Sequence, residues 1–162
     1  MRSLKAALVR FILWFLGRGI CACAAADSRV QAEVRSWAEG ARIVMRVGPD
    51  GPAVSLVKRG DRVRFLGTRA VPGAHLTIAF KHLDAALPVL LGQTSVAEGY
   101  AQRRMTMRGD ITFGMSVVRV MLLVEAYLFP QLITRKIMQR VPERAVSMGR
   151  IYLSTLLAAH GD

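Results

Sequence analysis

The chain has 162 residues, of which 52% are hydrophobic, and 23 Lys and Arg against 11 Asp and Glu give it a formal net charge of +12. This length suits one domain with a core of its own, and the apolar composition excludes an intrinsically disordered chain. The two cysteines, Cys21 and Cys23, lie too close together to form a disulfide framework. The excess of bases favours an anionic partner, such as nucleic acid, a phospholipid surface or an acidic protein.

Residues 1–16 are predicted to form an amphipathic helix. Apolar side chains recur at three- and four-residue spacing, at Leu4, Leu8, Phe11, Ile12 and Phe15. Bases lie on the other side, so this helix is suited to lie on an anionic bilayer. The membrane contact would then consist of Arg2, Lys5, Arg10, Trp14 and Phe15. Two alternatives stay open: the stripe packs on the domain, or the segment is a cleaved secretory signal ending near residues 22–24.

A glycine pair follows this helix. Residues 17–22 match the pattern G-x-G-x-x-A, but neither the preceding strand nor the βαβ unit that dinucleotide binding requires is predicted around them. Cys21 and Cys23 have no matching His or Cys ligands elsewhere, so no zinc site is expected. Asp27 is a suitable cap for a second helix, which we expect to run to about Glu39.

The middle of the chain is predicted to form a sheet. Five short segments alternate apolar and polar residues, near 42–47, 54–56, 62–65, 76–80 and 104–108. One face would carry Ile43, Met45, Val54, Leu56, Val63, Phe65, Leu76, Ile78, Phe80, Met105 and Met107. The opposite face would carry Arg42, Arg46, Ser55, Arg62, Arg64, His75, Thr77, Arg104 and Arg108. Such a division is typical of antiparallel sheets with one solvated side, so we expect a wet, strongly basic face.

Two short helices are expected between the fourth and fifth strands, and a longer one after the fifth. The segment 83–91 is predicted to be helical, and Pro88 should end or bend it. Ser95 and Glu98 fit a capping box for a second short helix. After the fifth strand, Asp110 is a suitable cap for a helix that extends to about Ala126.

The C-terminal third is expected to be helical and unusually apolar. The helix after Asp110 is apolar nearly all round, and two further helices are predicted near 128–139 and 143–160. No ordinary membrane span is expected, because the best candidate, 117–133, contains Arg119, Glu125 and Pro130. The single predicted sheet has only one apolar face, and these helices bring more apolar surface than that face can cover. The remaining apolar surface must contact another chain, a membrane or an apolar ligand.

No catalytic or metal-binding pattern is present in the sequence. The three histidines, His75, His82 and His160, form no H-x-x-x-H pair, and neither a nucleophile elbow nor a phosphate-binding loop occurs. His82 is expected to be a surface cap. The sequence therefore predicts a protein that is not an enzyme and has neither a metal nor a cofactor.

The stretch from Ala74 to Leu122 resembles the sterol carrier protein type 2 family of lipid-binding domains. The resemblance rests on residues 74–78 as a strand, the apolar 83–87, the turn Leu91-Gly92-Gln93, the small residues 95–97, and the strand 103–108 followed by Gly109-Asp110 and an apolar helix. The order of elements over residues 27–126 agrees with the family. In layout the chain is similar to bacterial quinone-biosynthesis accessory proteins that carry this domain. It departs from the family at His75, where an acid is common, and at Pro88.

The resemblance implies an apolar tunnel between sheet and helices that holds a lipid without converting it. By family position the tunnel would be lined by Leu76, Ile78, Phe80, Leu87, Leu90, Met105, Met107, Phe113, Val117 and Met121. Most of these residues also lie on the apolar sheet face or on the helix that follows it. The expected ligand is a fatty acyl, prenyl or quinone, or sterol-like molecule.

The sequence as a whole predicts an α+β fold with a five-stranded, mostly antiparallel sheet, helices covering one face, and extra N-terminal and C-terminal helices. Residues 1–26 would form the N-terminal helix and linker, 27–126 the lipid-binding domain, and 127–162 a C-terminal helical extension packed on that domain.

The expected function is binding or presentation of an apolar lipid at an anionic membrane surface, in the cytoplasm and peripheral to the inner face. A secreted or periplasmic location is the alternative. Partner proteins or a second copy would bind through the apolar helices, and a scaffold subunit for enzymes of lipid or ubiquinone biosynthesis is the second hypothesis. A nucleic-acid module is disfavoured, because the basic sheet face has no aromatic side chains on which bases stack.

Overall fold

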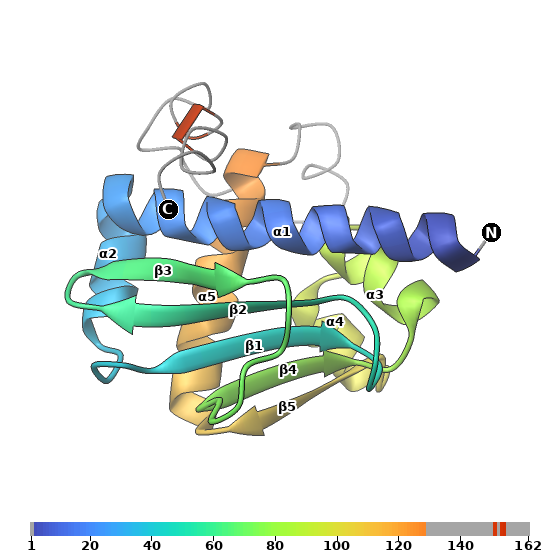
Figure 1. Cartoon of the computed structure of the whole chain (residues 1–162). Coiled ribbons are helices and arrows are strands. Elements are labelled where there is room, and N and C mark those ends of the chain that lie inside the picture. Colours follow the sequence, from blue (N-terminus) through green and yellow to red (C-terminus); the bar gives the residue numbers. More distant parts are fainter. Residues whose placement is uncertain (1, 129–150, 152, 155–162) are drawn as a thin grey trace.

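The computed structural model describes residues 2–128, 151, 153 and 154. Its elements, in chain order, are α1 (Arg2–Ala26), α2 (Ser28–Arg35), β1 (Arg42–Val47), β2 (Ala53–Arg59), β3 (Arg62–Gly67), β4 (Leu76–Phe80), α3 (Leu83–Leu90), α4 (Val96–Ala101), β5 (Met105–Gly109) and α5 (Ile111–Leu128) (Figure 1). The helices predicted near 128–139 and 143–160 lie outside the described residues, apart from residues 128, 151, 153 and 154. Ile151 is buried in the core.

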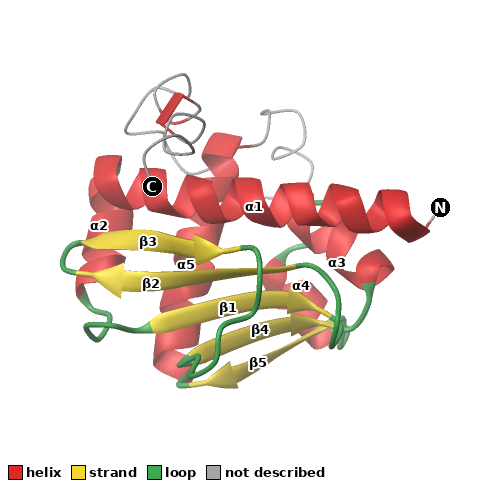
Figure 2. Cartoon of the chain, in the orientation of Figure 1, coloured by secondary structure: helices red, strands yellow, loops and turns green. Residues whose placement is uncertain are grey.

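The five strands form one open sheet in the order β3-β2-β1-β4-β5 (Figure 2). β1 pairs with β4 in parallel, with Met45 opposite Ile78, and the other three pairings are antiparallel. The parallel pair arises because the segment between β3 and β4 runs back across the sheet before β4 begins. The predicted α+β class with a five-stranded, mostly antiparallel sheet is therefore confirmed.

The helices cover the apolar face that the alternation predicted. Ile43, Met45, Leu56, Leu76 and Ile78 are at most 1% exposed on this face. α1 contacts β2 and β3, α4 and α5 contact β5, and α1 also contacts α3 and α5. In Figure 1 the sheet lies in front, α5 passes behind it and α1 runs along the β3 edge.

The opposite face is less wet than predicted. Arg62, Arg64 and Arg108 are exposed there, but Ser55 is fully buried. The segment 68–75 crosses this face: Ser55 Oγ donates to the Arg69 carbonyl at 2.6 Å and accepts from the backbone N–H of residue 71 at 3.2 Å. The expectation of a solvated Ser55 was wrong because sequence alternation does not show which loop returns over a sheet.

α1 is longer than the predicted helix and contains no linker. It continues through Gly17 and Gly19 to Ala26. A Cβ at Gly17 would lie 2.8 Å from Val54 Cγ2, and one at Gly19 would lie 2.9 Å from Leu128 Cδ1. The glycines therefore let one helix approach both the sheet and α5 closely. Glycine weakens a helix by about 1 kcal/mol relative to alanine, and packing overrides that preference here.

Side-chain caps set the starts of the shorter helices. Asp27 accepts from the Arg29 N–H at 2.8 Å, Ser95 from the Glu98 N–H at 3.1 Å, and Asp110 from the N–H of residue 113 at 2.7 Å. His82 caps α3 through Nδ1, which accepts from the N–H of residue 85 at 3.2 Å. These predicted caps are confirmed.

The ends of two helices differ from expectation. α2 ends at Arg35, before the expected end near Glu39. Pro88 lies inside α3, which continues to Leu90, so this proline does not end the helix.

Polar groups tie α2 and the residues after it to α5. Trp37 Nε1 donates to Ser116 Oγ at 2.8 Å, and Ser116 Oγ donates to Glu33 Oε2 at 2.6 Å. Arg119 forms a two-point ion pair with Glu33 at 2.7 and 3.0 Å. The hydrogen bonds from Arg119 hold the pKa of Glu33 below its ordinary value. This network fixes one side of α5.

A second network lies where α1 meets α2. The Tyr127 hydroxyl donates to the buried Asp27 carboxylate at 2.5 Å, and Arg29 Nη2 donates to it at 2.9 Å. Burial alone would raise the pKa of Asp27, but these hydrogen bonds outweigh it and lower the pKa. Burial, and secondarily the Asp27 charge, raise the pKa of Cys23 to about 12, so this thiol stays protonated.

Two described helices, Ser3–Ala26 and Ile111–Leu128, are long and apolar enough to cross a membrane by length and composition. The first of these helices is longer than the helix predicted over residues 1–16, and the sequence analysis did not single it out as a candidate span. Within the most apolar stretch of each, 50% and 61% of the residues are buried inside the protein. Core helices that pack on a sheet pass the same test, and both helices pack in this way.

The buried Glu125 should make stability depend on pH. Burial raises its pKa to about 8, well above the unfolded value, so the folded chain binds a proton that the unfolded chain releases between about pH 4.5 and 8. Stability should be largest below this window and fall as the pH rises through it, by up to roughly 1.4 kcal/mol per pH unit.

Urea unfolding at pH 5, 6.5 and 8 measures this effect. The Glu125→Gln variant removes the titrating group and should show a smaller fall between pH 5 and 8. An equal fall in both proteins would contradict this origin. The groups with lowered pKa values, Asp27 and Glu33, lose their contribution only at more acidic pH, so they do not interfere.

The close approach of α1 predicts that Gly17 tolerates no large side chain. Gly17→Leu should destabilise the fold by about 1–3 kcal/mol, because the added atoms overlap Val54 and Phe65. Ala25→Leu, at an exposed position of the same helix, is the matched control and should change stability by less than about 0.5 kcal/mol. Thermal unfolding measures the stability of both variants, and an equal change in the two would contradict the close approach at Gly17.

Candidate functional site

An apolar cavity of about 290 Å³ lies between α4, β5 and α5. It is lined by Val96, Ala97, Tyr100, Met105, Met107, Gly109, Ile111, Met115 and Val118. Among these described lining residues, Tyr100 alone has a polar side-chain group. We refer to this space as the α4–β5–α5 cavity. Its lining suits apolar matter, since it offers almost no directional contacts.

Two glycines place the helices around the cavity. A Cβ at Gly114 of α5 would collide with Met107 Sδ, and one at Gly99 of α4 would lie 2.8 Å from Val89 Cγ2. Strand alternation turns Met105 and Met107 to the same side of β5, toward the helices. Thus Gly114 lets α5 come close to β5 and Gly99 lets α4 come close to α3, and the cavity lies between α4, β5 and α5.

Several large apolar side chains at the cavity are exposed to solvent. Ile111 is 78% exposed, Tyr100 57% and Met115 49%. The three residues come from α4 and α5, so they form one cluster at the outer side of the cavity. A contiguous exposed apolar cluster beside a cavity is typical of a ligand or interaction site.

The structure brings two of the predicted lipid-binding residues, Met105 and Met107, to this cavity. It places six others in the core and away from the cavity lining: Leu76, Ile78, Phe80, Leu90, Val117 and Met121. Leu87 and Phe113 are partly buried and pack against that core. Phe113 meets Trp37 edge-on at 5.4 Å and lines a separate cavity of about 460 Å³.

Sequence reasoning missed the outer wall of the cavity. Ile111, Met115 and Val118 follow helical spacing along α5, next to the face formed by Phe113, Val117 and Met121. The signal was present, because the helix is apolar nearly all round. The family resemblance pointed to the α5 face that packs into the core. The apolar residues on the neighbouring α5 face are the ones that line the cavity.

The predicted membrane-contact residues lie along the first half of α1. Arg2 begins the helix, Arg10 is exposed, and Trp14 and Phe15 are partly buried. Lys5 pairs with Asp84 of α3 at 2.6 Å.

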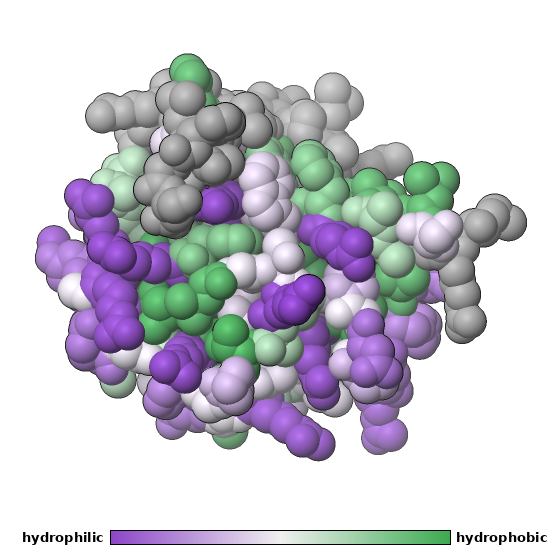
Figure 3. Space-filling view, viewed as in Figure 1, coloured by the Kyte–Doolittle hydropathy of each residue, from purple (hydrophilic) through white to green (hydrophobic). Residues whose placement is uncertain are grey.

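The apolar surface of α1 is divided between core and solvent. Val9, Leu13 and Leu16 are buried, so α1 packs on the domain, but mainly through a face beside the predicted stripe, of which only Ile12 is buried. Other residues remain exposed, namely Leu4 at 75%, Leu8 at 46% and Phe11 at 58%. We call these three the exposed α1 stripe. Figure 3 shows hydrophobic residues along this part of the helix, beside hydrophilic ones.

The described part of the chain shows no group of three or more His, Cys, Asp or Glu side chains placed to hold a metal. His75 Nδ1 accepts from the backbone N–H of Arg42 at 3.1 Å, and His82 caps α3. The cavity lining itself has no carboxylate, imidazole or thiol. The chemistry that these described side chains support is apolar binding.

No family model matches the chain, and no curated protein does. Several solved structures are similar in fold. The UbiJ-SCP2 ubiquinone synthesis protein is 15% identical, with 76% of this chain and 94% of that chain covered and a TM-score of 0.45. Sterol carrier protein 2 from Yarrowia lipolytica in its apo form is 12% identical, with 67% and 85% covered and a TM-score of 0.46.

Sterol carrier protein 2 like 2 from Aedes aegypti is 14% identical, with 61% of this chain and 95% of that chain covered and a TM-score of 0.36. All three names refer to SCP2. This is the family that residues 74–122 resemble in sequence. At these identities and TM-scores, the similarity concerns the arrangement of elements, and function has to be argued from the site itself.

Proposed function

We propose that this protein binds an apolar lipid in the α4–β5–α5 cavity, without converting it, and presents it at the surface of an anionic membrane. The observation that carries the proposal is the apolar cavity whose outer side is formed by exposed Ile111, Tyr100 and Met115. Exposed apolar surface of this kind is costly in water, so a ligand that covers it gains about 25 cal/mol for each Å² removed from solvent.

The lining indicates a ligand class. Three methionines, Met105, Met107 and Met115, contribute flexible thioethers that adapt to chains of different shape. The volume of about 290 Å³ lies just below the range of roughly 300–1,000 Å³ for ligand sites. A fatty acyl, prenyl or sterol-like ligand would place part of its length inside and the rest over the exposed cluster. The sequence resemblance of residues 74–122 supports the same class.

The exposed α1 stripe supports the membrane part of the proposal. Leu4, Leu8 and Phe11 project from a helix whose opposite face is anchored in the core, and the exposed Arg10 projects from the flank of the same helix. Shallow apolar burial combined with bases gives reversible binding to anionic lipid surfaces. With a net charge of +12, the chain would associate with the cytoplasmic face of the membrane as a peripheral protein.

The cavity is tested by filling it. Ala97→Trp adds an indole at an exposed lining position of α4 and should reduce the affinity for a fluorescent fatty acid at least tenfold, because it occupies the space of the ligand. Ala101→Trp is the matched control, since Ala101 is exposed on the same helix and does not line the cavity. Displacement titrations and native mass spectrometry of the purified protein provide the measurements.

Equal affinity of both variants for the fatty acid, or the lack of any bound apolar molecule in the unmodified chain, would contradict lipid binding in this cavity. The exposed Ile111, Tyr100 and Met115 would then favour the second function, a scaffold subunit that docks on a partner enzyme.

Membrane association is tested on the exposed stripe. Phe11→Ser should weaken binding to vesicles of phosphatidylcholine with phosphatidylglycerol by about tenfold, because a large apolar side chain no longer enters the interface. Leu66→Ser, at an exposed leucine of β3 that is 45% exposed, is the control and should bind as the unmodified chain does. Sedimentation with vesicles measures both, and vesicles of phosphatidylcholine alone should bind neither. If Phe11→Ser sediments as fully as the unmodified chain, the stripe has no part in membrane binding.

A further inference from the structure

A basic groove runs beside the first half of α1. It consists of two adjoining cavities of about 470 and 380 Å³, which share Gly51 and Pro52 of the turn between β1 and β2. The larger cavity reaches Arg10 of α1, and the smaller one reaches Lys5. Neither cavity belongs to the α4–β5–α5 site, with which they share no lining residue.

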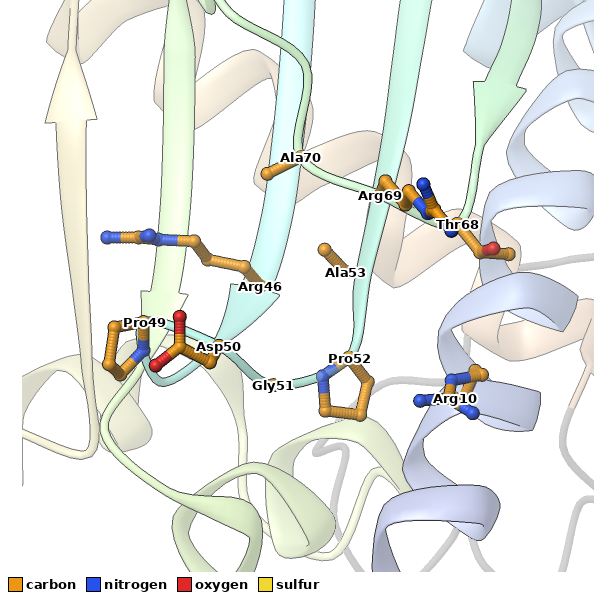
Figure 4. A pocket seen from close by; sticks show the side chains of 10 residues that line it. All are labelled: Arg10, Arg46, Pro49, Asp50, Gly51, Pro52, Ala53, Thr68, Arg69 and Ala70. Atoms are coloured by element: carbon orange, nitrogen blue, oxygen red, sulfur yellow. The ribbon is translucent and has the colours of Figure 1, made fainter.

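Arginines from separate parts of the chain surround the larger cavity (Figure 4). Arg10 and Arg69 lie on one side, and Arg46 and Asp50 lie on the other, with the Arg46 side chain extending away from Arg10 and Arg69. The arginines come from α1, the segment after β3, and β1. The tertiary fold, and not a run of charge in the sequence, therefore gathers them.

The charge of this groove is not neutralised from within the described part of the chain. No ion pair joins a carboxylate to Arg10, Arg46 or Arg69 there. Arg46 Nε is buried and has no hydrogen-bond partner. A buried donor without a partner is rare in folded proteins and needs an explanation. In the smaller cavity Lys81 and Lys5 face one acid, Asp84.

The groove has a fixed position relative to the exposed α1 stripe. Arg10 lies between Leu8 and Phe11 in the sequence, but at about 100° per residue it projects from the flank of the helix, about 100° round from Phe11. It therefore lines the groove while Leu8 and Phe11 face solvent. A bilayer that receives the stripe at the depth of its acyl chains brings its phosphates to the level of Arg10, since interfacial helices lie at the boundary of headgroups and chains. Guanidinium groups bind phosphate oxygens through paired hydrogen bonds.

We propose that this groove is a binding site for the phosphate headgroup of an anionic phospholipid, in the same bilayer that receives Leu4, Leu8 and Phe11. The inference rests on the proposed membrane association and adds the class of lipid that is recognised. The groove fixes how the protein lies on the membrane, because the headgroup and the exposed stripe together define one plane of contact.

The test uses the full chain and vesicles of phosphatidylcholine with or without phosphatidic acid. Arg10→Gln/Arg69→Gln removes the two bases on one side of the groove and should weaken binding to phosphatidic acid vesicles by roughly thirtyfold. Arg62→Gln/Arg64→Gln removes the same charge from exposed positions of β3 outside both cavities, and should weaken it by less than about threefold. Thermal unfolding checks that both variants fold.

An equal loss in the two double variants would show that net charge alone binds the membrane, and would overturn the proposal. Release of the protein by inorganic phosphate, at constant ionic strength and at the concentration of lipid phosphate, would also overturn it, since the site would then bind free phosphate. If Phe11→Ser loses binding while Arg10→Gln/Arg69→Gln does not, membrane association stands and the groove has no part in it. Fatty acid affinity of the α4–β5–α5 cavity should be unchanged in both double variants.

Discussion

The close approach of α1 to the sheet and to α5 determines how the apolar face is divided. Gly17 brings the helix against Val54 of β2, and Gly19 brings it against Val124 and Leu128 of α5. α1 therefore covers the β2–β3 half of the face, and α3, α4 and α5 cover the half formed by β4 and β5. Because that second cover is made of separate helices, space remains between them, and the α4–β5–α5 cavity lies there.

α5 is held on one side and left apolar on the other. Ser116 and Arg119 bind Glu33, while the neighbouring Met115 and Ile111 face the cavity and solvent. The hydrogen-bonded side fixes the position of the helix without any contact from a ligand. A ligand can thus enter or leave without the loss of the packing that holds α5 on the domain.

The strands and caps could be predicted because their signals are local. Alternation over residues 42–47 gives the bounds of β1, and Asp110 caps α5 through its own carboxylate. The features that could not be predicted depend on contacts between distant segments. Gly17 favours a helix end by propensity, but it lies mid-helix, where its lack of a side chain lets α1 approach Val54. Ser55 is buried by the segment that leaves the end of β3 beside it and turns over the sheet face. For the same reason strand alternation could place Met105 and Met107 on the apolar face, and the family resemblance implied that they line a cavity, whereas neither indicated Met115.

The methionine thioethers that line the cavity can be oxidised to sulfoxides. Met115 is 49% exposed and Met105 is 2% exposed, so an oxidant reaches the outer thioether first. Conversion to the sulfoxide makes a flexible apolar side chain polar, and methionine sulfoxide reductases reverse the change. A sulfoxide at Met115 would place a strong hydrogen-bond acceptor at the mouth of an apolar space, lowering its affinity for hydrocarbon while Met105 kept the interior unchanged. Under the proposed function, occupancy of the cavity would therefore depend on the redox state of the surroundings through Met115.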